Sequence, residues 1–324
     1  MVDFVALWRS GIFQERALAW IDAVVEERGQ VRVGPVDEFK IRFWSAVFRV
    51  PLQGQSVWFK VANPGQAFEG ELLVALSQIV PGRVIKPWAI EPSQGWSLLP
   101  DGGPTLSWTS EDDWIGLIDD VAELQRRCRP HQSLLPMLPS YEAATAADCA
   151  EALVKHLAGL PLGHPQHLDR ADAGRYLQQL PLLRNRMAVL EEAGPRPSLQ
   201  PNDAHPGNAV HPTRPGQPRR LFDLGDAVWS HPWAVLHSPG RGVAGARLSD
   251  PWPQAASTQR LVDAYTEHWP EVDRTDRPVV LEAVERLGAL HRLESWRRLI
   301  AEADPATEDQ LKLRLNPWLE QAFS

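Results

Sequence analysis

Three oxygen-bearing side chains lie close together in the sequence, with the types and spacing that phosphate chemistry needs. Asp203 and Asn208 stand five residues apart in the segment NDAHPGN, and Asp223 ends the apolar run RLFD further along. A loop with Asp and Asn at this spacing can present a base and a metal ligand to the same space. A carboxylate on the next turn can bridge a metal ion to phosphate, and hard oxygen ligands suit magnesium. The pattern therefore predicts a magnesium and phosphate site, against the simpler interpretation that Asp203 and Asn208 only stabilise turns.

A lysine in an apolar strand is the second feature that such a site needs. Lys60 lies in VWFKVA and is one of only five lysines in the chain. On a central strand it would face the phosphates of a nucleotide, whereas on an edge strand it would only face solvent. A helix carboxylate should hold such a lysine. Glu69 is the favoured partner because Leu72 and Leu76 follow it at helical spacing, and Glu71 is the alternative.

The first hundred residues are predicted to form an antiparallel sheet with one helix inserted, after an amphipathic N-terminal helix. Val, Phe and Trp are frequent in this region, and QGQ separates two strand-like runs, which is typical of a hairpin. Leucines at helical spacing then precede a Pro-Gly stop. The predicted elements are a helix over 13–29, paired strands over 46–52 and 56–62, a helix over 67–80, and strands over 83–90 and 95–100.

The rest of the chain is predicted to be mostly helical, with a short strand and loop section around Asp203 and Asp223. The expected elements are a joint over 101–106, helices over 111–128, 143–160, 173–194, 258–269, 278–303 and 308–323, a hairpin tip over 211–220 and a long loop over 238–254. Together the patterns predict an α+β chain in two lobes. The N-terminal lobe is expected over 1–100, the hinge near 98–104 and the C-terminal lobe over 101–324.

The composition argues against several classes of protein. The chain has 324 residues, 44% of them hydrophobic, which is enough for a large core and favours two domains or lobes. A net charge of −8 argues against nucleic-acid binding and favours a neutral or cationic small partner. The two cysteines, Cys128 and Cys149, cannot supply a disulfide framework. Because we find neither a leader peptide nor a membrane-spanning run, we expect a cytoplasmic protein without a membrane partner.

The sequence resembles the aminoglycoside phosphotransferase and choline kinase family, from about Phe39 to the C-terminal helices. NDAHPGN is similar to the family's His-Gly-Asp-Leu-His-Pro-Gly-Asn, FDLGDA to its Ile-Asp-Trp-Gly-Asp, and WFK and GWSLLPDGG to its strand lysine and hinge. The resemblance implies a two-lobe protein-kinase-like fold, ATP as donor, magnesium as cofactor and a small-molecule hydroxyl as acceptor. It implies that Asp203 is the catalytic base and that Asn208 and Asp223 bind magnesium. It also implies that Lys60, held by Glu69, binds phosphate. The backbone contacts to adenine would come from Leu98, Leu99 and Asp101.

Two features depart from the family pattern. Pro201 stands in place of the motif histidine and Asn202 in place of the following glycine, which changes the loop but keeps its Asp. No glycine-rich loop precedes Lys60, and FWSAVFRV takes its place. Ser45 is the candidate there to offer a hydroxyl and a backbone N–H to phosphate, beside the interpretation that it is an ordinary turn residue.

Five further residues are candidates for supporting or binding roles. Asp226, in GDAVWSHPW, is predicted to support the loop or to touch the substrate. His205 and His231 are interpreted as structural hydrogen-bonding residues. Trp296 and Arg297 are candidates to line an acceptor pocket.

The function that these residues favour is transfer of the γ-phosphate of ATP to a hydroxyl of a small molecule. The acidic balance favours an amine-bearing acceptor, such as an aminoglycoside or an amino sugar. A nucleotide-binding pseudokinase is the first alternative, because the motif histidine and the glycine-rich loop are missing. A metallophosphoesterase is the second, because Asp203-x-His205 and Gly225-Asp226 echo metal motifs of those enzymes. No Asn-His-Asp or Asn-His-Glu follows to complete them.

Overall fold

A five-stranded antiparallel sheet forms the N-terminal part of the chain. The computed structural model describes residues 2–239 and 255–324. The strands, in spatial order, are β1 (Asp37–Arg42), β2 (Ser45–Leu52), β3 (Gln55–Ala62), β5 (Trp96–Pro100) and β4 (Ala89–Glu91). All neighbours are antiparallel. Because β3 lies in the middle of the sheet, β2 and β5 fix its backbone from both sides.

The predicted hairpin is formed by β2 and β3, which pair along their full lengths. Gly54 in the turn has a φ of +79°, a conformation that glycine adopts without strain. The register places Lys60 opposite Val47, and Trp58 lies two residues before Lys60 on the same face. The hairpin therefore gathers these three side chains on one face of the sheet.

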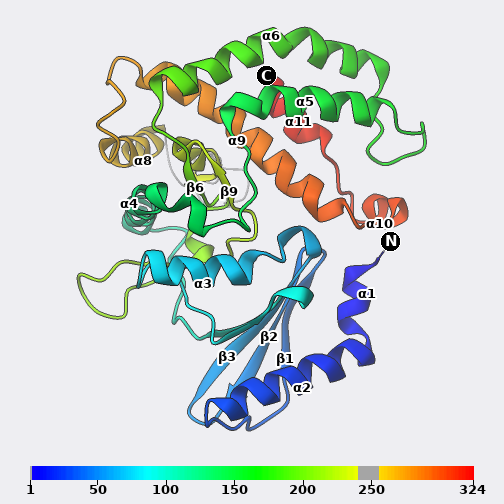
Figure 1. The fold of residues 1–324 in the computed structure, drawn as a ribbon, viewed down its shortest axis with the longest axis vertical. Helices are drawn as coiled ribbons and strands as arrows, with labels where there is room; N and C mark the ends of the chain where they lie inside the picture. Colours follow the sequence, from blue (N-terminus) through cyan, green and yellow to red (C-terminus); the bar gives the residue numbers. More distant parts are fainter. Residues whose placement is uncertain (1, 240–254) are drawn as a thin grey trace.

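Three helices accompany the sheet, α1 (Phe4–Arg9), α2 (Gly11–Glu27) and α3 (Glu69–Ile79). α2 packs on one face, where the ring of Trp20 lies 5.9 Å from Phe59 and 5.7 Å from Trp96, measured between ring centroids. α3 is the predicted inserted helix, and it lies between the sheet and the helical part of the chain (Figure 1). A residue in its first turn can therefore reach both parts.

Helices make up most of the remaining chain. The predicted helix over 111–128 has these bounds in the structure, because Ser110 caps it and a stripe of buried apolar residues follows. No described helix has both the length and the apolar character needed to cross a bilayer. Among the described residues the helices are α4 (Glu111–Cys128), α5 (Ala143–Ala158), α6 (Arg170–Ala193), α8 (Ala255–Glu267), α9 (Arg277–Ile300), α10 (Pro305–Gln310) and α11 (Asn316–Phe323).

Two short strand pairs hold the polar loops. The pairs are β6 (Ser198–Gln200) with β9 (Val228–Ser230), and β7 (Ala209–Val210) with β8 (Arg220–Leu221). The predicted hairpin tip over 211–220 connects β7 to β8. The loop with Asp203 runs from β6 to β7, and the loop with Asp223 runs from β8 to β9. The two strand pairs therefore bring these loops together.

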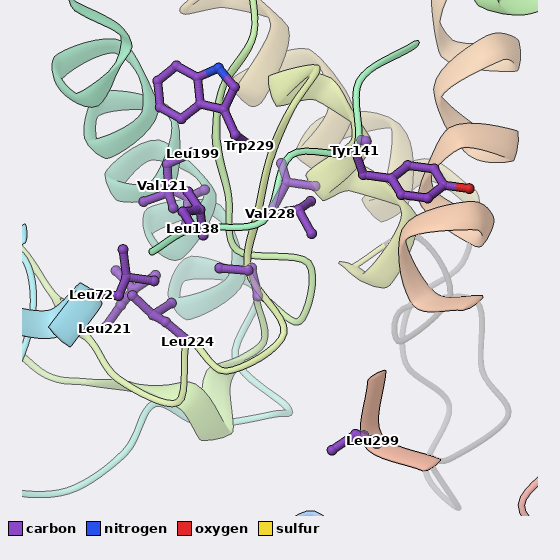
Figure 2. Close-up of a cluster of buried hydrophobic side chains, with 14 of the residues drawn as sticks. Leu72, Val121, Leu138, Tyr141, Leu199, Leu221, Leu224, Val228, Trp229 and Leu299 are labelled. Atoms are coloured by element: carbon purple, nitrogen blue, oxygen red, sulfur yellow. The ribbon is translucent and has the colours of Figure 1, made fainter. Parts of the chain in front are cut away.

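One hydrophobic core runs through the sheet part and the helical part. Figure 2 shows Leu72 of α3 in the same cluster as Leu221 and Leu224, which flank Asp223 in the chain. Leu221 and Leu224 are each only 2% exposed. Their burial anchors the backbone on both sides of Asp223, whereas 42% of the Asp223 side chain remains exposed.

Two predicted elements were wrong in their extent. The strand predicted over 83–90 is reduced to β4, because Pro87 has no backbone N–H to donate to a ladder. The helix predicted over 308–323 is split into α10 and α11, because the ring of Pro317 cannot follow a continuous helix. The long loop predicted over 238–254 lies outside the described residues, except for its first two.

Candidate active site

Lys60 forms two ion pairs at the centre of the candidate site. Its Nζ lies 2.6 Å from Glu69 Oε2 and 2.6 Å from Asp223 Oδ1. The three residues come from β3, from the first turn of α3 and from the loop between β8 and β9. Glu69 Oε1 also accepts a hydrogen bond of 3.2 Å from the N–H of Leu224. Glu69, rather than Glu71, is therefore the carboxylate that holds the strand lysine.

The charge of Lys60 is secured by these neighbours. Lys60 is 6% exposed and Glu69 is 3% exposed. Burial alone lowers the pKa of Lys60, but the carboxylates of Asp223 and Glu69 outweigh burial and raise this pKa above its ordinary value. Burial raises the pKa of Glu69, and the charge of Lys60 opposes that effect. Lys60 therefore remains a fixed cation through the physiological pH range.

Two non-glycine residues of the site adopt left-handed backbone conformations. The φ angle is +65° at Asn202 and +59° at Asp223. Asn and Asp tolerate this conformation better than other non-glycine residues, and such conformations gather at functional sites. Asn202 takes the place of the glycine in the motif that the sequence resembles. The replacement is conservative in backbone terms, because Asn can keep the conformation for which glycine is suited.

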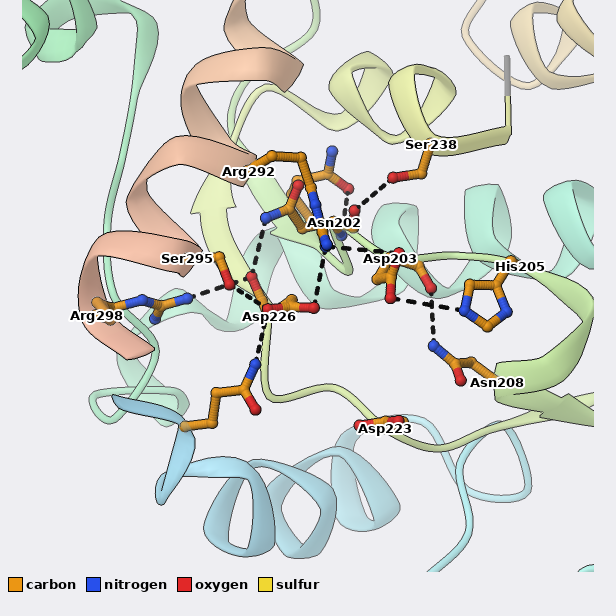
Figure 3. A network of polar contacts seen from close by, with 12 residues as sticks. Asn202, Asp203, His205, Asn208, Asp223, Asp226, Ser238, Arg292, Ser295 and Arg298 are labelled. Atoms are coloured by element: carbon orange, nitrogen blue, oxygen red, sulfur yellow. Dashed lines mark hydrogen bonds and ion pairs between the residues drawn. The ribbon is translucent and has the colours of Figure 1, made fainter. Parts of the chain in front are cut away.

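The loop with Asp203 is tied to the loop with Asp223. The side-chain amide of Asn208 donates a hydrogen bond of 3.0 Å to the backbone oxygen of Asp203. The backbone oxygen of Asn208 accepts a 3.0 Å hydrogen bond from the N–H of Phe222. Figure 3 shows Asp203 and Asn208 on one segment, with Asp223 on the neighbouring one. The predicted base and the two predicted metal ligands thus lie in one region.

His205 supports this loop from the side. Its ring centroid lies 4.6 Å from that of Trp108, and its Nε2 lies 3.6 Å from Asp203 Oδ2. His231 is 3% exposed, and its Nδ1 accepts a 3.2 Å hydrogen bond from the N–H of Trp233. Both placements fit the structural interpretation of these histidines.

Asp226 is held by donors from two distant parts of the chain. Gln66 Nε2 donates to Asp226 Oδ1 over 2.7 Å, and Arg292 donates to Oδ2 over 3.0 Å. The hydroxyl of Ser295 also donates to Oδ1. Gln66 precedes α3, whereas Arg292 and Ser295 lie on α9. Local sequence patterns identify Asp226 but not these three partners, because such patterns do not connect distant residues to the loop.

A cavity of about 390 Å³ opens beside Lys60. Of the predicted nucleotide contacts, Lys60, Glu69, Leu99 and Asp101 line this cavity, whereas Ser45 and Leu98 lie outside it. Leu98 is fully buried, and its backbone oxygen accepts a 2.7 Å hydrogen bond from the N–H of Trp88. The other lining residues are Phe39, Lys40, Val47, Trp58, Ile85, Pro100, Gly102, Gly103, Thr105, Gly207, Asn208, Val210, Phe222 and Asp223.

The two residues proposed for the acceptor side lie on α9, away from this cavity lining. The ring centroid of Trp296 lies 6.0 Å from that of Trp44, in the turn between β1 and β2. Arg297 Nε lies 2.7 Å from Glu294 Oε2, and nearly half of the Arg297 side chain is exposed. Trp296 therefore joins the helical part to the sheet part, and Arg297 lies at the surface.

The donor set fits a magnesium ion that a nucleotide helps to bind. Within residues 2–239 and 255–324, no three His, Cys, Asp or Glu side chains group together as a metal site. Magnesium commonly takes only one or two protein ligands, with phosphates and waters completing its shell. The amide of Asn208 points its nitrogen at Asp203, which leaves its oxygen as the ligand atom, and Asp223 adds a carboxylate beside the cavity. Both residues therefore suit magnesium held together with phosphate.

The chain is similar to known proteins in its structure, whereas comparisons of its sequence find no match. No protein-family model matches the chain, and no curated protein matches its sequence. A choline kinase from Streptococcus pneumoniae is similar in structure, with 10% identity, coverage of 94% of this chain and 99% of that chain, and a TM-score of 0.60. A macrolide 2′-phosphotransferase from Brachybacterium faecium matches with 16% identity, coverage of 91% and 97%, and a TM-score of 0.55.

An aminoglycoside-3′-phosphotransferase of type VIII is also similar in structure. Its identity is 18%, the match covers 83% of this chain and 98% of that chain, and the TM-score is 0.50. Each of the three matches spans nearly the whole length of the known structure. The chain therefore has the kinase-like fold of these small-molecule phosphotransferases.

Proposed function

We propose that the protein transfers the γ-phosphoryl group of ATP to a hydroxyl of a small molecule, in a magnesium-dependent reaction. The main support for this proposal is the arrangement of three charged side chains. Lys60, Glu69 and Asp223 converge within hydrogen-bond distance beside a cavity whose lining also includes Asn208. Cation, carboxylates and amide are the groups that position and neutralise a nucleotide triphosphate in phosphoryl transfer.

The proposed roles follow from the placement of each residue. Lys60 is the fixed cation for the phosphates, and Glu69 keeps its ammonium group in place. Asn208 and Asp223 would hold magnesium, which when bound neutralises charge on the phosphates. Asp203 orients the acceptor hydroxyl and takes its proton as the oxygen bonds to phosphorus and ADP leaves. Position and charge supply most of the rate enhancement in this scheme.

The cavity is the proposed nucleotide site. Its apolar lining includes Val47, Leu99 and Phe222, which suit a flat base, and the Lys60 ion pairs lie beside it. We propose that the backbone from Leu99 to Asp101 meets the adenine edge, whereas Leu98 and Ser45, which lie outside the cavity lining, make no contact with the nucleotide. In this scheme residues 1–100 form the nucleotide-binding lobe and residues 101–324 the catalytic and acceptor-binding lobe.

The proposed acceptor is an amine-bearing alcohol, such as an aminoglycoside or an amino sugar. Two observations support this class. The chain carries a net charge of −8, which favours a cationic partner. Proteins with a similar fold include an aminoglycoside phosphotransferase and a choline kinase. A macrolide phosphotransferase is also similar in structure, so the acceptor panel must extend beyond aminoglycosides and choline-like alcohols.

A pseudokinase is the competing function. It is favoured by Pro201 in the place of the motif histidine. Against it, Lys60, Glu69 and Asp223 are assembled, and Asp203 and Asn208 are both present beside them. The metallophosphoesterase alternative finds no support in the fold, which is kinase-like.

Release of ADP from magnesium-ATP tests the proposal. The acceptor panel should contain kanamycin, erythromycin, choline, ethanolamine, glucosamine and glucose. We expect ADP release that depends on one class of acceptor and falls roughly 10²–10⁴-fold in Asp203→Asn. Asp276→Asn is the matched control, because this carboxylate is exposed at the start of α9. Tight nucleotide binding without turnover for every acceptor would favour the pseudokinase.

A further inference from the structure

Arg292 reaches from α9 into the space between two carboxylates. Its Nη1 lies 3.5 Å from Asp203 Oδ1 and 3.0 Å from Asp226 Oδ2. Figure 3 shows the guanidinium group between these two side chains. One nitrogen therefore faces both the proposed base and the carboxylate three residues after Asp223.

The guanidinium group is well shielded from solvent. Only 15% of the Arg292 side chain is exposed, compared with 30% of Asp203 and 14% of Asp226. Burial lowers the pKa of Arg292, but the charges of Asp203 and Asp226 outweigh burial and raise it. Arg292 is therefore a permanent positive charge in a partly buried place. Salt screens an ion pair only weakly there, and the planar guanidinium group restricts the positions that a partner carboxylate can take.

Asp226 is fixed independently of Arg292. Gln66 and the hydroxyl of Ser295 both donate to Oδ1, which leaves Oδ2 for Arg292. The backbone oxygen of Asp226 accepts a 3.3 Å hydrogen bond from the Asn202 side chain. Because both carboxylate oxygens are engaged, Asp226 is suited to hold Arg292 in place rather than to accept a proton from a substrate.

We propose that Arg292 is a positioning residue for Asp203, and that Asp226 is the anchor that fixes Arg292. This inference rests on the proposed function, in which Asp203 is the base. A base works only when its oxygen lies close to the productive position, and a displacement of about 1 Å can cost roughly 100-fold in rate. Asn208 constrains the backbone of Asp203, whereas Arg292 constrains one oxygen of its side chain.

Arg292 also has a packing role that the test must separate from positioning. Its guanidinium carbon lies 5.7 Å from the ring centroid of Trp318, on α11. Loss of the side chain would therefore weaken the contact between α9 and α11, whatever its effect on Asp203. A change in stability alone would not support the proposal.

The experiment compares Arg292→Gln, Arg292→Lys and Asp226→Asn with Arg286→Gln as control. Arg286 lies on the same helix and is also 15% exposed, but it bonds to Glu282 and to the C-terminal residue. Turnover of magnesium-ATP is measured with water and with the acceptors of the panel as phosphoryl acceptors. The readouts are kcat, the KM for magnesium-ATP and the melting temperature.

We expect Arg292→Gln to lower kcat roughly 10- to 100-fold while the KM for magnesium-ATP changes less than about 3-fold. Arg292→Lys should recover part of the loss, because it restores the charge without the planar fork. Asp226→Asn should also lower kcat. A double variant that combines Arg292→Gln with Asp226→Asn should lose little more than Arg292→Gln alone, because the two residues act as a unit. Arg286→Gln should keep the kcat of the parent protein.

Three kinetic results would overturn the proposal: kcat and KM both unchanged in Arg292→Gln, an equal loss of kcat in Arg286→Gln, or a rise in the KM of Arg292→Gln with kcat retained. The last would mean that Arg292 binds phosphate directly. A crystal structure of Arg292→Gln gives a readout that needs no turnover. An Asp203 side chain that is displaced or occupies two conformations would support the proposal, and an unmoved side chain would overturn it. Absence of turnover in the parent protein would contradict the proposed function instead, while this structural result would still decide the role of Arg292.

Discussion

The ammonium group of Lys60 and the carboxylate of Asp223 lie 2.6 Å apart, although 163 residues separate them in the chain. The contact joins the central strand of the sheet to the loop between β8 and β9. Glu69 holds Lys60 from the other side at the same distance. One lysine thus connects the sheet, α3 and the helical part, so its removal should affect both stability and nucleotide binding.

Lys60→Met should destabilise the protein by about 3–5 kcal/mol, because it leaves the buried Glu69 without its partner. The double variant Lys60→Met with Glu69→Leu should recover a large part of this loss, because no unpaired buried charge remains. Urea unfolding measures both. Lys155→Met is the control, because Lys155 forms an exposed pair with Glu151 and should cost less than about 1 kcal/mol. An equal effect of both lysines would contradict the account.

Asn208→Ala should weaken magnesium-dependent nucleotide binding. The amide oxygen is one of two proposed protein ligands, so the magnesium concentration for half-maximal ATP binding should rise at least about 10-fold. Asp223→Asn should act in the same direction. Calorimetric titration of ATP at several magnesium concentrations measures the change. If both variants bind ATP with the magnesium dependence of the parent, these residues are not the metal ligands.

Acid should destabilise the fold through two buried histidines. Burial lowers the pKa of His231 and of His291 to about 3, from an ordinary value of 6.5. Both are neutral in the fold, so their contribution to stability is complete above pH 6.5 and is lost as the pH falls from 6.5 toward 3. At pH 4.5, two units below the ordinary value, the loss should be about 2.7 kcal/mol for each histidine, given roughly 1.4 kcal/mol per pKa unit.

Melting curves between pH 7.5 and 4.5 check this prediction. His291→Gln should flatten the pH dependence, at the cost of its 2.8 Å contact with the Ser230 hydroxyl. His156→Gln is the control, because His156 is exposed at the end of α5 and should leave the pH dependence unchanged. A pH dependence that stays the same in His291→Gln would show that other groups cause the acid sensitivity.

Gly65→Ala should destabilise the contact between the sheet part and α9. A Cβ atom at residue 65 would lie 2.4 Å from the backbone oxygen of Arg298, and backbone atoms cannot yield easily. Overpacking of this kind costs about 1–3 kcal/mol. Gly163→Ala is the matched control, because nothing lies within 4 Å of a Cβ there. Equal melting temperatures for the two variants would mean that the close approach at Gly65 is not constrained.

The elements with strong local signals were predictable from the sequence. The helix over 111–128 combines a cap, an acidic first turn and an apolar stripe, and the structure has the same bounds. The β2–β3 hairpin follows from its strand-like runs and its turn. By contrast, the effect of Pro317 on the last helix depends on a clash with the preceding turn, which the apolar pattern of the segment hides.

The candidate site was predictable where sequence motifs place its residues. NDAHPGN and FDLGDA identify Asp203, Asn208 and Asp223, and helical spacing favours Glu69 over Glu71 as the partner of Lys60. Arg292 was not predictable in this way. Its position on α9 follows from helical periodicity, but its contact with Asp203 depends on how α9 crosses a loop far away in the chain. Tertiary packing, rather than local pattern, supplies that information.

Transfer of the labelled γ-phosphoryl group from ATP to an acceptor is the decisive test of the proposed reaction. Initial rates should be measured for the parent protein, Asp203→Asn and Asp276→Asn, with the acceptor that gives the most ADP. We expect a phosphorylated product from the parent and from Asp276→Asn, and a roughly 10²–10⁴-fold slower rate from Asp203→Asn. A phosphorylated product formed by Asp203→Asn at the rate of the parent would contradict the account.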